Sequence, residues 1–126
     1  MILNEEDMIY RAELEALMAV AHDEIRKNAD AEQVIAIRTA RGNLHLAVLT
    51  EDDVSQEAEV LKKMKEQGDT KVICFLAIWN DGNIDCGSKK LREGIRRMNW
   101  DNYEALTVIR SAEVFTPITL RSLYKK

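Results

Sequence analysis

Hydrophobic residues recur along this chain with two periods, and these periods predict the order of its helices and strands. Over residues 4–27 apolar side chains return every three or four positions, which is the spacing of one buried helix face. The stripe comprises Leu14, Leu17, Met18, Ala21 and Ile25. Asn4 precedes three acidic residues, so we expect it to cap this helix where the helix dipole favours negative charge.

Strand-like segments follow this helix. Residues 34–37 and 44–49 are mostly aliphatic and flank a Gly-Asn turn signal, which predicts a β-hairpin. Residues 72–79 form an unbroken apolar run, typical of a strand in the middle of a sheet that is covered on both faces. A turn is predicted at residues 80–83, where asparagine, aspartate and glycine cluster.

Two shorter helices are predicted, one on each side of the apolar run. The first begins after Ser55, a candidate N-terminal cap, and ends at Gly68. The second begins after Ser88, which is also a candidate cap. The inward-facing residues are expected to be Ala58, Leu61 and Met64 in the first helix and Leu91, Ile95 and Met98 in the second.

The C-terminal part of the chain predicts two further strands. Residues 99–103 form a short connection, residues 106–109 predict a fourth strand, and Val114 with Phe115 predict a short fifth one. Pro117 is expected to break the chain after it. The resulting order predicts an α/β fold, a three-layer α/β/α domain with a mixed central sheet of about five strands.

Composition narrows the classes of protein that remain. A chain of 126 residues fits a single domain over residues 1–126. The net charge of -4 argues against a general nucleic-acid binder, and the basic stretch at residues 89–97 is interrupted by an acid and lacks stacking aromatics. No signal-like start or membrane-length apolar run is present, and two cysteines make no disulfide framework. We expect a cytoplasmic protein that uses no membrane partner.

The candidate chemistry lies at the starts of the two shorter helices. Glu57 and Glu59 occupy the first turn of one helix, and Cys86 and Lys89 flank the start of the other. Zinc-dependent nucleobase deaminases carry a His or Cys two residues before a glutamate, followed by a Pro-Cys-x-x-Cys run at the start of the next helix. The glutamate and one cysteine of that pattern are present here, and Asp85 stands in place of the proline.

With these segments in this order, the chain resembles the cytidine deaminase family. The long first helix, the hairpin, the Ala-Glu and Cys-Gly pairs and the closing Thr119–Leu123 stretch spread the resemblance over nearly the whole chain. The resemblance implies a cytidine deaminase-like α/β/α fold and a homo-oligomer, either a dimer or a tetramer. The Asn-x-Glu that contacts the ribose in that family is absent from residues 49–52.

The resemblance also implies a role for each site residue. Glu59 takes the position of the proton shuttle and Cys86 that of the first thiolate, whereas Glu57 and Lys89 replace the other two ligands. A carboxylate can bind zinc, but a protonated lysine cannot. We therefore expect a degenerate site with no metal and no cofactor, in which the Lys89 ammonium pairs with Glu57 or Glu59 in place of the metal.

The favoured interpretation is a non-catalytic binding or interaction protein, with a nucleoside or nucleotide-like ligand. One alternative is a divergent zinc-dependent deaminase, a hydrolase with Glu59 as proton shuttle and Cys86 as a ligand. Another is an unrelated small oligomeric α/β domain, which predicts no cleft where the two helix starts meet. The histidines His22 and His45 make no ligand pair with a cysteine, so both are predicted to be structural or surface residues.

Overall fold

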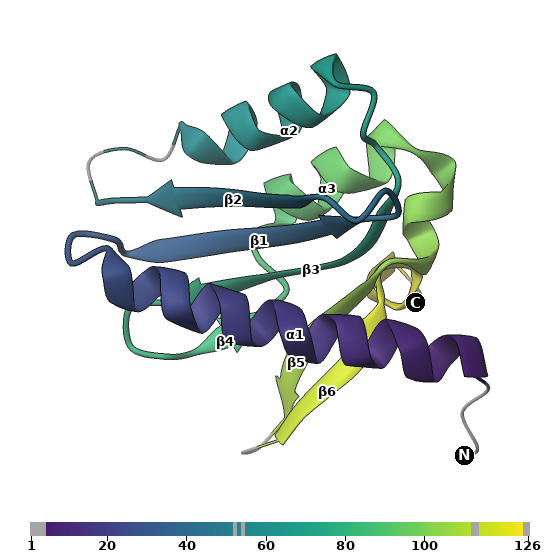
Figure 1. Ribbon diagram of the computed structural model, residues 1–126, viewed down its shortest axis with the longest axis horizontal. Coiled ribbons are helices and arrows are strands. Elements are labelled where there is room, and N and C mark those ends of the chain that lie inside the picture. The colour runs from purple at the N-terminus through teal and green to yellow at the C-terminus, as the bar shows by residue number, and fades with distance from the viewer. Residues whose placement is uncertain (1–4, 52, 54, 112–113, 125–126) are drawn as a thin grey trace.

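Residues 5–51, 53, 55–111 and 114–124 are described by the computed structural model, which has three layers (Figure 1). A mixed sheet lies between helix α1 on one face and helices α2 and α3 on the other, which confirms the expected α/β/α architecture. The helices are α1 (Glu5–Lys27), α2 (Gln56–Glu66) and α3 (Lys89–Met98). Two 3-10 helices lie further along the chain, at Trp100–Glu104 and Leu120–Tyr124. No helix in these ranges is both long and apolar enough to cross a membrane.

The sheet has six strands within the described residues, in the order β2-β1-β3-β5-β6, and the short β4 pairs with β3. β3 and β5 are parallel, and the other neighbours are antiparallel. The strands are β1 (Gln33–Thr39), β2 (Leu44–Leu49), β3 (Val72–Trp79), β4 (Ile84–Asp85), β5 (Leu106–Ser111) and β6 (Val114–Thr119). The apolar run of β3 therefore lies inside the sheet, as its composition predicted.

Alternating side chains of β1 and β3 fill two separate cores. Ile35 and Phe75 point to the layer of α2 and α3, whereas Val34 and Leu76 point to α1. The predicted stripe of α1 packs on the second core through Leu14, Leu17 and Ala21, which are buried, and through Met18 and Ile25, which are partly buried. Each large side chain buried in this way stabilises the fold by roughly 1.5–3 kcal/mol.

Two predicted details of α2 are wrong. Ser55 occupies the N-cap position, but its backbone is already helical, with φ of -64° and ψ of -23°, and its hydroxyl donates to Asp53. A capping side chain needs an extended backbone to reach the helix N–H groups, so Ser55 caps nothing. Ala58 is exposed, and Val60 instead is buried beside Leu61.

The prediction that Pro117 breaks the chain is also wrong. β6 continues through Pro117, which lies opposite Val108 of β5. β6 is the last strand of the sheet, and an edge strand accommodates proline because half of its main-chain N–H groups face away from the neighbouring strand. The predicted cap Asn4 lies outside the described residues.

Candidate functional site

The starts of α2 and α3 meet through Glu57 and Ser88. The hydroxyl of Ser88 lies 3.1 Å from each carboxylate oxygen of Glu57 and donates to that carboxylate. The same oxygen accepts a hydrogen bond of 3.0 Å from the main-chain N–H of Leu91, so Ser88 caps α3, as predicted. One hydroxyl thus stabilises the start of α3 and joins it to the first turn of α2.

Asp85 shapes the loop that leads into α3. One of its carboxylate oxygens accepts the Gly87 N–H at 2.8 Å, and the other accepts the indole N–H of Trp79 at 2.9 Å. Gly87 has φ of 78°, and a Cβ there would lie 2.6 Å from Cδ2 of the buried Leu91. The geometry of the turn therefore accounts for Asp85 and Gly87, whatever the role of the cysteine between them.

Cys86 is half-buried in this loop. Burial is the main cause that raises the pKa of its thiol, and the neighbouring Arg92 lowers it by less. The thiolate is the form that binds metals and attacks electrophiles. Cys86 therefore carries a protonated thiol at neutral pH.

The predicted ion pair of Lys89 with Glu57 or Glu59 is wrong. Among the ion pairs of the described residues, none involves Lys89, which lies exposed at the start of α3. Glu59 is also exposed. It follows Glu57 by two positions, so the two side chains point about 200° apart around the helix. An exposed ammonium keeps its hydration, so it gains little by approaching a carboxylate.

These side chains do not fit a zinc ion. Glu57, Cys86 and Lys89 offer a carboxylate already bound to Ser88, a single thiol and an ammonium, so at most two of the three could act as ligands. Structural and catalytic zinc sites use neutral imidazoles, thiolates and carboxylates in a set of three or four. Within the described ranges, no group of three or more His, Cys, Asp and Glu side chains is placed to hold a metal ion.

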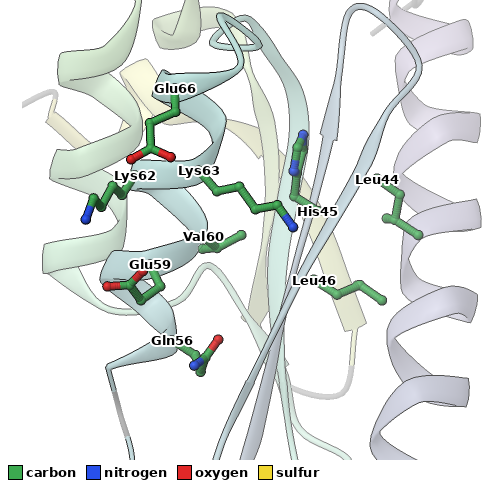
Figure 2. A pocket seen from close by; sticks show the side chains of 9 residues that line it. All are labelled: Leu44, His45, Leu46, Gln56, Glu59, Val60, Lys62, Lys63 and Glu66. Atoms are coloured by element: carbon green, nitrogen blue, oxygen red, sulfur yellow. The ribbon is translucent and has the colours of Figure 1, made fainter.

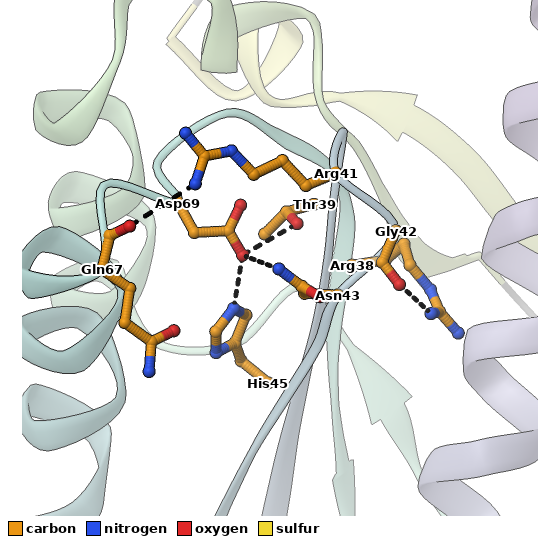
Figure 3. Close-up of polar contacts among 8 residues, drawn as sticks. All are labelled: Arg38, Thr39, Arg41, Gly42, Asn43, His45, Gln67 and Asp69. Carbon is orange, nitrogen blue, oxygen red and sulfur yellow. Dashed lines mark hydrogen bonds and ion pairs between the residues drawn. The ribbon is translucent and has the colours of Figure 1, made fainter.

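A second polar cluster joins His45 to Asp69 (Figure 3). One carboxylate oxygen of Asp69 lies 2.8 Å from Nε2 of His45 and accepts hydrogen bonds of 3.0 Å from both Thr39 and Asn43. Asp69 is 2% exposed and His45 is 9% exposed. His45 is thus a buried residue, but its pairing with Asp69 could not be predicted, because Asp69 follows a helix stop and matches no motif.

A pocket of about 500 Å³ opens beside His45, between the edge strand β2 and α2 (Figure 2). Glu59 belongs to its wall, although its carboxylate points away from β2. The sequence did contain an indication that a polar contact forms on the inward face of β2. His45 alternates with Ala47 and Leu49, so an imidazole was placed among inward-facing apolar positions, where it needs a polar partner.

No protein-family model and no curated protein matches this chain. Among solved structures, the cytidine deaminase from Mycobacterium leprae is similar with a TM-score of 0.65 and 12% identity, covering 89% of this chain and 97% of the other. A mutant cytidine deaminase from Mycobacterium tuberculosis is similar with a TM-score of 0.53 and 14% identity, covering 72% and 74% respectively. The chain has a cytidine deaminase-like fold, as its resemblance predicted.

Proposed function

We propose that this chain is a cytoplasmic binding protein with a cytidine deaminase-like fold that does not catalyse zinc-dependent deamination. The observation that carries this proposal is the contact between Glu57 and Ser88. The carboxylate that replaces a metal ligand is used to join two helices. A lysine, which stands in place of another ligand, lies exposed at the same helix start.

The ligand class follows from the fold. The two similar structures named above are cytidine deaminases, so we propose a nucleoside or nucleotide-like ligand near the two helix starts. Glu59 retains the position of the family's proton shuttle but faces solvent in the free chain. An ionised carboxylate at this position can accept hydrogen bonds from such a ligand.

Metal analysis combined with an activity assay tests the absence of hydrolysis. Purified protein, supplied with zinc and then desalted, is expected to retain far less than one zinc per chain. It is also expected to release no ammonia from cytosine and adenine nucleosides. The alternative is a divergent deaminase with Cys86 as a ligand and Glu59 as proton shuttle, and it predicts about one bound zinc per chain together with ammonia release. That result would overturn the proposal.

Ligand binding and self-association need separate measurements. Calorimetric titration with cytidine, adenosine and their monophosphates is expected to detect binding that weakens in Glu59→Gln, because a neutral amide is a poorer acceptor than a carboxylate. No detectable binding of any of these compounds would contradict the ligand class. The proposed dimer or tetramer is tested by light scattering on a sizing column, where a monomer of 14.4 kDa is the contrary outcome.

A further inference from the structure

The pairing of His45 with Asp69 determines which nitrogen of the imidazole carries a proton. Burial works to raise the pKa of Asp69, but the hydrogen bonds from His45, Asn43 and Thr39 lower it below its usual value. An ionised carboxylate only accepts hydrogen bonds, so Nε2 of His45 must donate to it. The neutral imidazole therefore carries its lone pair on Nδ1.

Nδ1 of His45 makes no hydrogen bond within the described residues. It is not one of their buried unpaired side-chain atoms, so it is open to solvent although the residue is only 9% exposed. An accessible acceptor of this kind can bind a water or a donor group of a ligand. The ring lines the pocket between β2 and α2 (Figure 2). The pocket is thus bordered by an accessible acceptor nitrogen, and the Asp69 carboxylate holds its ring in place.

Lys63 provides the opposite wall. Its side chain extends from α2 toward β2 and ends on the side of His45, whereas Glu59 and Lys62 point away from β2 and the Glu66 carboxylate stays beside α2 (Figure 2). No ion pair of Lys63 is found in the described ranges. The ammonium is therefore available to an anionic group in the pocket.

The open edge of β2 provides further donors. The main-chain N–H of Thr39 donates to the carbonyl of Asn43, which sets the alternation of the antiparallel ladder with β1. By that alternation, the main-chain groups of Leu44 and Leu46 face away from β1, at the end of the sheet. Their side chains point toward α1, so it is their backbone that borders the pocket (Figure 2).

We propose that this pocket binds the phosphoryl group of a small phosphate monoester, held by Lys63, by the edge of β2 and by Nδ1 of His45. The choice rests on the mixture of donors and one acceptor. A phosphate monoester has a second pKa of about 6, so near neutral pH a fraction of it carries a hydroxyl, which can donate to Nδ1, beside its charged oxygens. Sulfate and carboxylates lack that hydroxyl at neutral pH. This site lies on α2 away from Ser88, and the inference does not depend on the proposed function.

The test is a titration of the ¹⁵N-labelled full chain at pH 7, followed by long-range proton–nitrogen spectra of the imidazole rings. Inorganic phosphate and phenyl phosphate are expected to shift Nδ1 of His45 saturably, with a Kd below about 1 mM. His22, which is exposed, is the internal control because the chain has two histidines. Absence of a saturable shift, or an equal shift with sulfate and acetate, would overturn the proposal.

Two lysine variants complete the test without disturbing the pair of His45 and Asp69. Lys63→Ala is expected to weaken phosphate binding about tenfold, the scale of one lost charged hydrogen bond. Lys62→Ala removes the same charge from the same helix. Lys62 also lines the pocket, but its ammonium points away from β2 and His45, so the Kd is expected to stay within about twofold of the wild-type value. Equal weakening in both variants would show that net charge alone attracts the anion, and would contradict the site.

Discussion

Ser88 and Glu57 join two helix starts that are 31 residues apart in the sequence. Because the Ser88 hydroxyl also accepts the N–H of Leu91, it acts as a cap and as a bridge at once. In the family that this fold resembles, the corresponding segments hold a metal ion. Here a neutral hydroxyl and a carboxylate join the two segments directly.

Removing the Ser88 hydroxyl should destabilise the protein measurably. Ser88→Ala loses the cap of α3 and the contact with Glu57, which together should lower the free energy of unfolding by about 1–2 kcal/mol. Urea denaturation followed by circular dichroism measures this loss. Ser55→Ala is the matched control, because Ser55 makes no side-chain capping bond, and it should cost less than about 0.5 kcal/mol. Equal losses in the two variants would contradict the role of Ser88.

Restoring the family's ligands should create a metal site. Glu57→Cys combined with Lys89→Cys places two thiols beside Cys86, and three thiolates with a water can hold about one zinc ion per chain. Cobalt substitution, which gives thiolate charge-transfer absorption, and metal analysis measure the binding. The control pairs Glu57→Cys with Lys90→Cys, where the second thiol points about 100° away around the helix. A folded Glu57→Cys and Lys89→Cys variant that binds no more metal than the control would contradict the convergence of the two helix starts.

Gly87 should tolerate a methyl group less well than Gly82. Both glycines have positive φ, at 78° and 90°, so alanine is strained at either position by about 1 kcal/mol. Only at Gly87 would the new Cβ also approach Leu91, at 2.6 Å, whereas at Gly82 no atom lies within 4 Å. The Gly87→Ala variant should therefore lose about 2–3 kcal/mol in urea denaturation, and Gly82→Ala about 1 kcal/mol. Equal losses would show that Leu91 yields at no cost.

Acid should weaken the cluster around Asp69. The pKa of Asp69 is lower in the folded protein than the unfolded value of about 3.9, so its contribution is fully present above that value and is lost as the pH falls through the folded pKa. Asp69→Asn should cost about 2 kcal/mol at pH 7, and the difference from the wild type should shrink at about pH 3. Urea midpoints at both pH values measure this.

The control for that prediction is Asp53→Asn. Asp53 is an exposed carboxyl that binds Ser55 in a surface turn, and its variant should leave the urea midpoint close to the wild-type value at both pH values. A difference between wild type and Asp69→Asn that stays constant from pH 7 to pH 3 would show that the Asp69 carboxyl is not the titrating group.

Periodicity was sufficient for most of the architecture. The stripe from Leu14 to Ile25, the hairpin and the run of β3 each have one dominant hydrophobic pattern, and each forms the predicted element. Pattern was insufficient where local chemistry has two outcomes. Ser55 and Ser88 are both serines before a helix, yet only Ser88 has the extended backbone that lets it cap.

Buried polar partners were beyond the reach of any local pattern. Asn102, predicted to be part of a loop, is fully buried and its amide binds the carbonyls of Thr70 and Ile95 and the N–H of Val72. Its partners come from two other elements of the fold. A hydrogen bond between residues about 30 positions apart depends on how the layers pack, which single-residue propensities do not contain.

By itself, the sequence determined the order of elements, the three layers and the two helix starts that carry the candidate chemistry, because hydrophobic periodicity and turn residues act over a few positions. Only the tertiary structure decided which side chains meet. It brought Glu57 to Ser88 rather than to Lys89, and it placed Asp69 behind His45. Those choices depend on competition between burial, hydration and hydrogen bonding, which is settled only when the layers pack together.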